Sequence, residues 1–231
     1  MRWIGLTLVA GILVFCGCKR EPSNKAGEGT SKAATVGYAD PEIQRAEFGT
    51  LWQEIAKQEA IGNVDSVLRQ MAERTGINNI QWCLEELVDS NEASGAGNAQ
   101  VLLARVRELR NLDQKGIAAF IEQAKSEGNV DSLCVSLFAL RGYDPGREAA
   151  EALGSIGDQR AVHLLATRLL HAACDVSMEH RVKDVRKELR LSLVRALENC
   201  MGVEFGEYDG SKEGAAAIIE QCEAWLKERG F

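Results

Sequence analysis

Proline and aromatic residues are scarce in this chain. Its 231 residues include 3 prolines, and aromatic side chains make up 6% of the sequence. Alanine, leucine, glutamate, arginine and glutamine are plentiful instead. These residues favour helix, whereas strands are enriched in β-branched and aromatic residues. No convincing pattern of short strands separated by turns is present either. The composition therefore predicts an all-α fold and disfavours a β-sandwich.

Motifs that carry catalysis are lacking as well. The sequence contains no glycine-rich phosphate-binding loop, no strong metal-binding pattern and no local sequence that supports a nucleophile–base pair. The formal net charge is −7, and an acidic chain lacks the basic surface of a general nucleic-acid binder. We therefore predict a protein without catalysis, without a cofactor and without a nucleic-acid partner.

The strongest apolar run lies at the N-terminus and is short. Met1 and Arg2 give a positive start, and Trp3–Phe15 is uncharged and almost wholly apolar, which is typical of a signal-peptide core. As a helix, the run from Trp3 to Cys18 would be roughly 24 Å long, short of the ~30 Å hydrocarbon core of a bilayer. We predict a signal peptide rather than a permanent membrane span.

Two cysteines end this run. Gly17 precedes Cys18 and is small, as a signal cleavage site requires, whereas the bulky Phe15 precedes Cys16. The run Phe15-Cys16-Gly17-Cys18 resembles a bacterial lipobox. The resemblance implies that residues 1–17 are removed and that Cys18 carries lipid. Two or more acyl chains on this residue would anchor the protein stably to a membrane. A disulfide or a metal-binding Cys-x-Cys is the other interpretation of these two cysteines.

Residues 18–39 are expected to form a lipidated, flexible tether. The segment is rich in Gly, Ser, Lys, Ala and Thr and has no apolar periodicity, so it cannot bury enough surface to offset chain entropy. Lys19 follows the lipidated cysteine, and in lipoproteins of the enteric type a residue other than Asp there implies export to the outer membrane. We expect an exported, lipid-anchored protein, at the periplasmic face of the outer membrane rather than at the inner membrane.

Short amphipathic helices are predicted throughout residues 40–143. Asp40 and Pro41 suit the N-cap and the first helical position. Apolar periodicity then marks successive helices, which we place over residues 41–61, 64–75 and 77–89 and, after a loop over 90–98, around Leu102 and Ile121.

One short sequence occurs twice in this region. Gly-Asn-Val-Asp-Ser at residues 62–66 recurs at residues 128–132. Each copy is predicted to end one helix and to cap the next through its asparagine. The match favours a duplicated helical hairpin, and the alternative is that a good capping sequence has recurred by chance.

The clearest pattern lies in Arg147–Leu170. Apolar and small residues recur at helical spacing on two inner faces, which we expect to form a closely packed core that includes Ala149, Leu153, Val162, Leu165 and Leu169. Asp158 is predicted to cap the second helix. The succession Ala-Leu-Gly, Ile-Gly-Asp and Arg-Ala-Val, followed by leucine, resembles a HEAT-type repeat of the short variety found in phycobilin-lyase-like proteins.

This resemblance implies an α-solenoid of stacked helical hairpins, with HEAT-like repeats over 144–231 and degenerate repeats over 40–143. In the family, an Asp and an Arg of successive repeats often interact, and Asp158 and Arg186 occupy those positions. Stacked hairpins share a core and expose long surfaces that usually bind proteins. The expected function is a membrane-tethered scaffold for protein–protein interaction in the bacterial cell envelope. The alternative is an accessory subunit or a lyase-like enzyme that acts on a bound small molecule.

A basic strip is the candidate partner-binding surface. Four cations follow helical spacing along one face of an otherwise acidic chain: Lys183, Arg186, Lys187 and Arg190. Such a strip would suit an acidic protein or an anionic envelope polymer. The alternative is a solvated face neutralised by Asp184 and Glu188.

Histidines and cysteines suggest further sites. Zinc could use these residue types, but the spacing of the four candidates matches no strong zinc pattern, so we expect solvated or capping roles for His163, His171, Cys174 and His180. Exported proteins tolerate disulfides, and Cys200 and Cys222 could form one between the last two long helices. Cys83 and Cys134 are predicted to be buried thiols.

Overall fold

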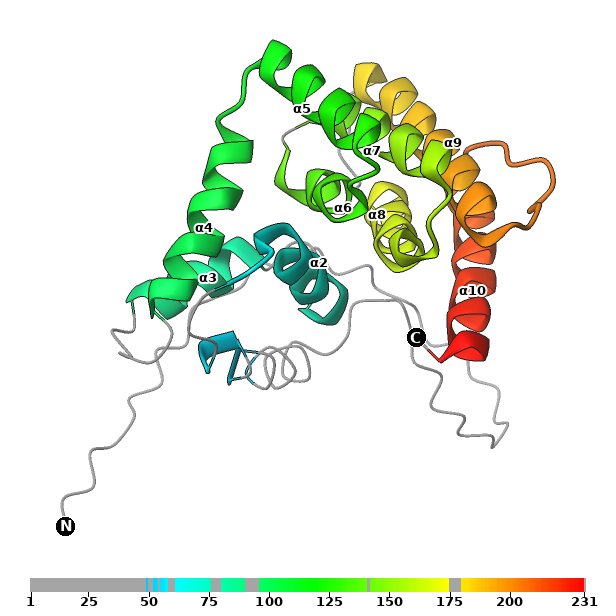
Figure 1. Cartoon of the computed structure of the whole chain (residues 1–231). Coiled ribbons are helices and arrows are strands. Elements are labelled where there is room, and N and C mark those ends of the chain that lie inside the picture. Colours follow the sequence, from blue (N-terminus) through cyan, green and yellow to red (C-terminus); the bar gives the residue numbers. More distant parts are fainter. Residues whose placement is uncertain are drawn as a thin grey trace. The chain divides into compact units, whose positions relative to one another are not determined.

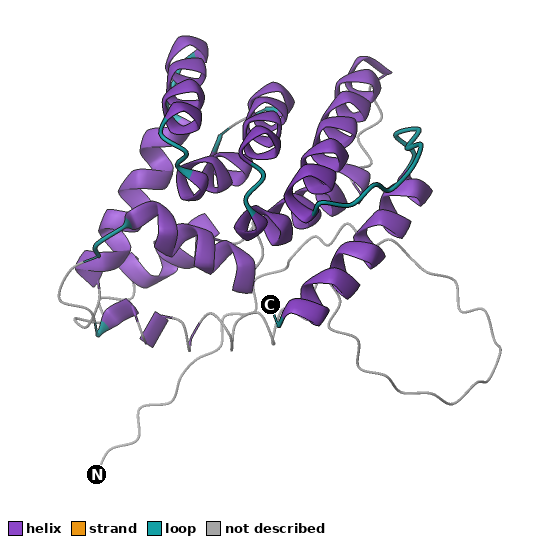
Figure 2. Cartoon of the chain, turned by 45° about the vertical axis from the view of Figure 1, so that its right-hand side comes forward, coloured by secondary structure: helices purple, strands orange, loops and turns teal. Residues whose placement is uncertain are grey.

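The computed structural model describes residues 49, 52–53, 55–57, 61–75, 80–89, 96–140, 142–174 and 180–230. All regular secondary structure within these ranges is helical, which confirms the predicted all-α class for this part of the chain (Figure 2). All the described residues belong to one compact unit of the chain. The predicted signal peptide, Cys18 and tether lie outside the described residues.

The helices follow one another closely along the chain (Figure 1). In chain order they are α2 (Val64–Thr75), α3 (Ile80–Asp89), α4 (Ala96–Arg110), α5 (Gln114–Ser126), α6 (Val130–Ala139), α7 (Tyr143–Ile156), the 3-10 helix η1 (Gln159–Ala161), α8 (Val162–Cys174), α9 (His180–Met201) and α10 (Lys212–Arg229). The predicted helix over 64–75 coincides with α2, and α3 ends at the predicted residue. No described helix is both long and apolar enough to cross a membrane.

Asparagine and aspartate begin the helices as predicted. The Asn63 and Asn129 side chains accept hydrogen bonds from the backbone N–H of Ser66 and Ser132, at 3.0 and 3.1 Å. The two copies of Gly-Asn-Val-Asp-Ser therefore cap α2 and α6 in the same way. Asp158 caps η1, which continues directly into α8.

Helices that are two apart in the chain pack against each other in the second half. Contacts join α5 to α7, α7 to α9, α6 to α8 and α8 to α10, and the sequential pairs α6–α7 and α8–α9 also pack. Figure 1 shows α7 between α5 and α9. The first half differs, because α2 contacts α6 as well as α3 and α4. As a result α2, α6 and α4 meet at one place.

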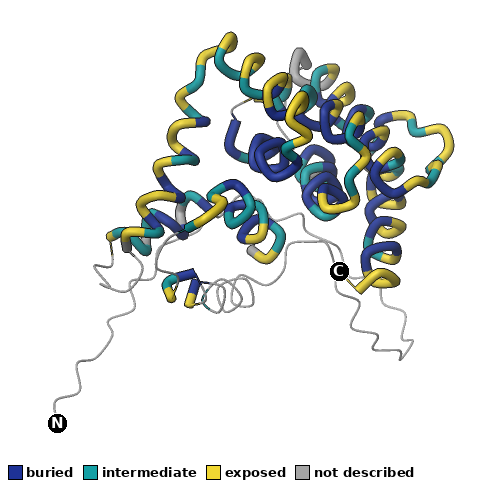
Figure 3. The backbone as a smooth tube through the Cα atoms, viewed as in Figure 1, coloured by how far each residue is buried: buried dark blue, intermediate teal, exposed yellow. Residues whose placement is uncertain are grey.

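The core contains the residues that the sequence predicted. Ala149, Leu153, Val162, Leu165 and Leu169 each have 0% of their surface exposed. Nearly all of α6 is buried, and Figure 3 shows α6 and α8 as mostly buried segments.

Backbones approach closely between α7 and α9. A Cβ atom added at Gly154 would lie 2.9 Å from the Cα of Ala196. Only glycine allows this approach, so Gly154, which lies within α7, lets the two helices come together here.

A candidate binding hollow at α2 and α4

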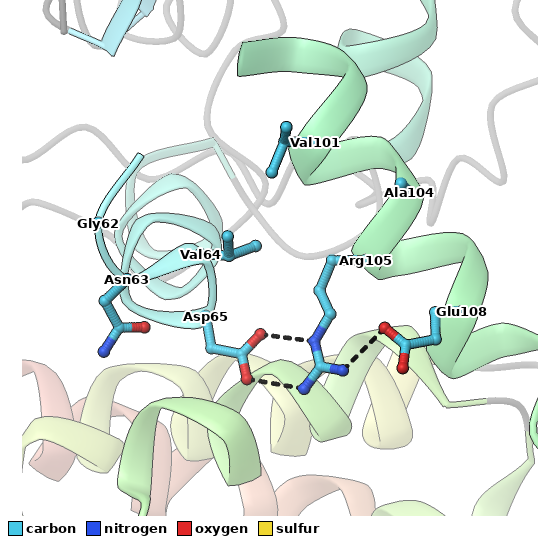
Figure 4. A pocket seen from close by; sticks show the side chains of 8 residues that line it. All are labelled: Gly62, Asn63, Val64, Asp65, Val101, Ala104, Arg105 and Glu108. Atoms are coloured by element: carbon cyan, nitrogen blue, oxygen red, sulfur yellow. Dashed lines mark hydrogen bonds and ion pairs between the residues drawn. The ribbon is translucent and has the colours of Figure 1, made fainter. Parts of the chain in front are cut away.

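A shallow, open hollow lies where the start of α2 faces the middle of α4 (Figure 4). Its volume is about 810 Å³. Polar and apolar side chains both line it: Gly62, Asn63, Val64, Asp65, Val101, Ala104, Arg105 and Glu108.

A bidentate ion pair forms the polar side of the hollow. Arg105 of α4 donates from Nε to Asp65 Oδ1 at 2.9 Å and from Nη2 to Asp65 Oδ2 at 3.0 Å, and its Nη1 donates to Glu108 Oε2 at 3.0 Å (Figure 4). The guanidinium also lies 5.1 Å from the ring centre of Phe120. The hydrogen bonds to Asp65 raise the pKa of Arg105 above its usual range, so the guanidinium stays charged.

Asp65 is bound from a second side. It is 8% exposed, and the hydroxyl of Ser132 on α6 donates to its Oδ2 at 2.5 Å. A buried charge is tolerated only when it is paired and hydrogen-bonded. Arg105 supplies the opposite charge for Asp65, and Ser132 supplies a further hydrogen bond. Asp65 thus connects three helices at one point.

The apolar side of the hollow contains an unusual residue. Among the described residues, Val101 is the large hydrophobic side chain that counts as exposed, with 48% of its surface accessible. Ala104, one turn further along α4, is exposed too, and Val64 lies across from them on α2. The hollow therefore offers apolar surface beside a paired set of charges.

A second ionic group lies between α2, α6 and η1. Arg69 of α2 donates from Nε to Asp131 Oδ1 of α6 at 2.6 Å and from Nη1 to Glu73 Oε1 at 2.5 Å. Arg160 of η1 approaches the same Asp131 oxygen at 4.0 Å while pairing with Asp158 at 2.8 Å. Burial raises the pKa of the Glu73 carboxyl, although Arg69 opposes this shift.

The two aspartates are equivalent residues of the duplicated sequence. Asp65 and Asp131 each stand two residues after the capping asparagine, and each binds an arginine from another helix. The sequence revealed the two copies and their caps but gave no sign of these arginine partners. The repeated Asp was the available signal, because a charged residue that recurs at the start of predicted buried helices needs an opposite charge.

The predicted basic strip is divided by the packing of α9. Arg186 is 4% exposed, donates from Nε to the Tyr143 hydroxyl at 3.0 Å and lies 5.5 Å from that ring's centre. Arg190 is half-buried and donates to the carbonyl oxygens of Gly210 at 2.8 Å and Ala172 at 3.1 Å. Two of the four cations thus serve the packing of the chain itself.

Lys187 and Lys183 are the other two cations of the strip, and partner binding by the strip stays a prediction. Lys187 is exposed, with its side chain against Gly210. The side chain of Lys183 lies outside the described residues. Asp158 pairs with Arg160, and Arg186 donates to Tyr143; the contact between Asp158 and Arg186 that the resemblance implies stays a prediction.

The histidines on α8 are half-buried. Burial lowers the pKa of both, and for His171 burial and the nearby Arg168 lower it to about 4, so both imidazoles are neutral at pH 7. The side chains of Cys174 and His180 lie outside the described residues. Within the described ranges, no three His, Cys, Asp or Glu side chains are grouped so as to hold a metal ion.

The described cysteines are buried and are not in disulfides: Cys83, Cys134, Cys200 and Cys222. This confirms the prediction for Cys83 and Cys134. Cys200 and Cys222 are not joined, since Cys200 Sγ lies 3.7 Å from Leu153 O and Cys222 Sγ lies 3.7 Å from Met201 Sδ. Burial raises their pKa values to about 11 and about 12, which makes both thiols unreactive at neutral pH.

Comparisons with protein-family models, with curated proteins and with solved structures each return no match.

Proposed function

We propose that this chain is a lipid-anchored, HEAT-like scaffold of the bacterial cell envelope, which binds another protein and carries out no reaction. The observation that carries the proposal is the packing order of α5 to α10, in which each helix contacts the one two places further along the chain. Stacked helical hairpins produce this order, because each hairpin buries its apolar face against the next. The HEAT-type pattern in Arg147–Leu170 supports the same arrangement.

The first half is proposed to be a degenerate part of the array. Here α2 contacts α6 in addition to its neighbours, so regular stacking gives way to a closer arrangement around α6. The duplicated capping sequence before α2 and α6 supports descent from one hairpin.

The hollow at α2 and α4 is the proposed partner-binding surface. Exposed apolar side chains such as Val101 gain free energy when a partner covers them, at roughly 25 cal/mol per Å² of apolar surface buried. Arg105 and its two carboxylates add direction and register, which is the usual contribution of charged groups to an interface. A catalytic acid or base must exchange a proton with its substrate. Arg105, Asp65 and Glu108 are instead held in ion pairs with each other, which favours a role in binding.

The N-terminal sequence supports the proposed location. A positive start, a short apolar run and Cys18 after a small residue together fit a signal peptide followed by a lipid anchor. Residues 18–39 would then hold the helical unit off the membrane surface.

The experiment is affinity capture of the tagged full chain from detergent-solubilised membranes, with chemical cross-linking before solubilisation. We compare wild type with Val101→Asp in the hollow and with Ala119→Asp, a matched change at an exposed helical residue of α5 outside the hollow. We expect one stoichiometric protein with wild type and Ala119→Asp, and at least a tenfold loss with Val101→Asp.

Other outcomes contradict defined parts of the proposal. If Val101→Asp captures the partner as well as wild type does, the scaffold binds elsewhere. If a small molecule is captured and no protein accompanies it, the scaffold function is wrong and the alternative of an accessory or lyase-like protein gains support.

A further inference from the structure

The central helix α6 is covered by α2 on one side. Nine of its ten residues are buried, and Cys134 within it has 0% of its surface exposed. Cys134 lies near the α2 side chains Arg69 and Glu73, whose charges act on its thiol, while burial raises its pKa well above the usual range. On α2, Leu68 and Met71 are fully buried. Asp131 and Cys200 of α9 also act on this thiol, so α2 covers Cys134 together with neighbouring helices and labelling of the thiol reports opening of this packing.

Polar contacts at two points attach α2 to α6. Arg69 binds Asp131 with side-chain exposures of 13% and 12%, and Asp65 accepts the hydroxyl of Ser132. Breaking a buried pair by removing one partner is costly, because the remaining charge loses its compensation. These two contacts add to the apolar packing of α2, in which Leu68 and Met71 are fully buried.

The helices of the second half pack through a more extensive apolar core. α9 contacts α7 and α8, and α10 contacts α8, while Arg186 and Ser192 of α9 also donate hydrogen bonds to Tyr143 and Glu151 of α7. Segments that depend on few contacts open locally with a lower free energy than the core does.

We propose that α2 is a strap across α6, and that it opens as a local unit to uncover Cys134 and the apolar face of α6 while α9 and α10 stay folded. The contacts of Arg69 with Asp131 and of Asp65 with Ser132 set how often the strap opens. In a scaffold, such a strap would make an apolar helix face available only after these contacts break. The proposal concerns the chain alone and does not depend on the proposed partner.

The test is pulsed labelling of the native full chain in mild detergent with N-ethylmaleimide, followed by peptide mass spectrometry. This reads each cysteine separately. Arg69→Met keeps the apolar stem of the side chain and removes both of its ionic contacts. We expect Cys134 to react about tenfold faster in this variant, in line with the loss of a charged hydrogen bond, and Cys222 on α10 to react at the wild-type rate.

Arg107→Met is the matched control. Arg107 is on α4, and its side chain is 57% exposed and pairs with Glu85 at 3.3 Å. Its removal changes the charge by the same amount but leaves the strap attached, so labelling of Cys134 should not change. Ser132→Ala is a milder second variant in case Arg69→Met does not fold. It removes only the hydroxyl that binds Asp65, and severalfold faster labelling confined to Cys134 is expected.

Two results would overturn the inference. Equal acceleration of Cys134 and Cys222 would mean that the whole helical unit unfolds together. Wild-type labelling of Cys134 in both Arg69→Met and Ser132→Ala would mean that these contacts do not hold α2 on α6.

Discussion

Ser132 donates a hydrogen bond of 2.5 Å to Asp65, although the two residues lie 67 positions apart in the chain. Each belongs to one copy of the duplicated sequence Gly-Asn-Val-Asp-Ser, so the two copies bind each other directly. Arg105 completes the arrangement from α4 with its bidentate pair to Asp65. A single buried carboxylate thus joins three helices, and the consequences can be measured.

Asp65→Asn should destabilise the helical unit. The amide keeps the shape of the side chain but removes the charge that Arg105 and Ser132 bind, and hydrogen bonds to charged groups contribute about 1.5–3 kcal/mol each. We expect a loss of about 2–3 kcal/mol in the free energy of unfolding, measured by urea titration of the full chain in mild detergent.

Glu108→Gln is the control for that measurement. Glu108 binds the same guanidinium, but its side chain is 62% exposed. Exposed pairs contribute roughly 0–1 kcal/mol, so this variant should unfold close to wild type. Equal losses from the two variants would show that Asp65 has no special role.

Leu165→Ala should open a cavity in the core. Leu165 on α8 has 0% of its surface exposed. Replacing a fully buried leucine by alanine costs about 2–5 kcal/mol, because transfer free energy is lost and the neighbours relax only in part. The same urea titration measures it, and Val101→Ala at an exposed position should change stability by about 0.5 kcal/mol or less. A small effect of Leu165→Ala would mean that α8 is packed in a different register.

Local patterns made much of this fold predictable. Helical periodicity located α2 and the core residues Leu153 and Leu165, because a helix must turn its apolar face inward. Asn63 and Asn129 were recognisable as caps for the same kind of reason, since capping involves atoms only three residues apart. Interactions of this range depend little on the rest of the chain.

Long-range contacts were not predictable in the same way. The sequence placed Arg186 in an exposed basic strip, yet its partner Tyr143 lies 43 positions away and draws it into the interior. Arg69 and Asp131 lie 62 positions apart, and nothing in the sequence pattern joined them before the fold showed their ion pair. Helical spacing shows which residues share a face but not which helix covers that face.

Stability should fall on acidification because of His171. Burial, with a smaller effect of Arg168, lowers the pKa of His171 from 6.5 to about 4. Between these two pKa values the imidazole is protonated in the unfolded chain and neutral in the folded chain. The contribution of His171 to the free energy of unfolding is therefore fully present above pH 6.5 and is lost as the pH falls from there toward 4. Urea midpoints of His171→Gln should decline less over this range than those of wild type. Parallel declines would assign the pH dependence to other groups.

Cys18→Ala should abolish anchoring. If Cys18 is the lipidated residue, wild-type protein in the membrane fraction should have an intact mass that starts at Cys18 and includes acyl chains. The variant should keep its signal peptide or leave the membrane fraction, because the thiol that accepts the lipid is gone. Cys16→Ala is the matched control and should be processed normally. A variant lacking Cys18 that is still processed and membrane-bound would contradict lipidation at this residue.

Two glycines in helices should respond to alanine with opposite signs. At Gly154 a new Cβ would lie 2.9 Å from the Cα of Ala196, so α7 and α9 would have to move apart. Overpacking of this kind costs about 1–3 kcal/mol. At Gly97 on α4 nothing lies within 4 Å of the new Cβ, so alanine should stabilise the helix by about 0.5–1 kcal/mol through its higher helix propensity. Thermal melts of both variants, compared with wild type, test the close approach of α7 and α9 directly. If Gly154→Ala melts at or above the wild-type temperature, the new Cβ has room, and α7 and α9 are further apart than the distance of 2.9 Å to the Cα of Ala196 requires.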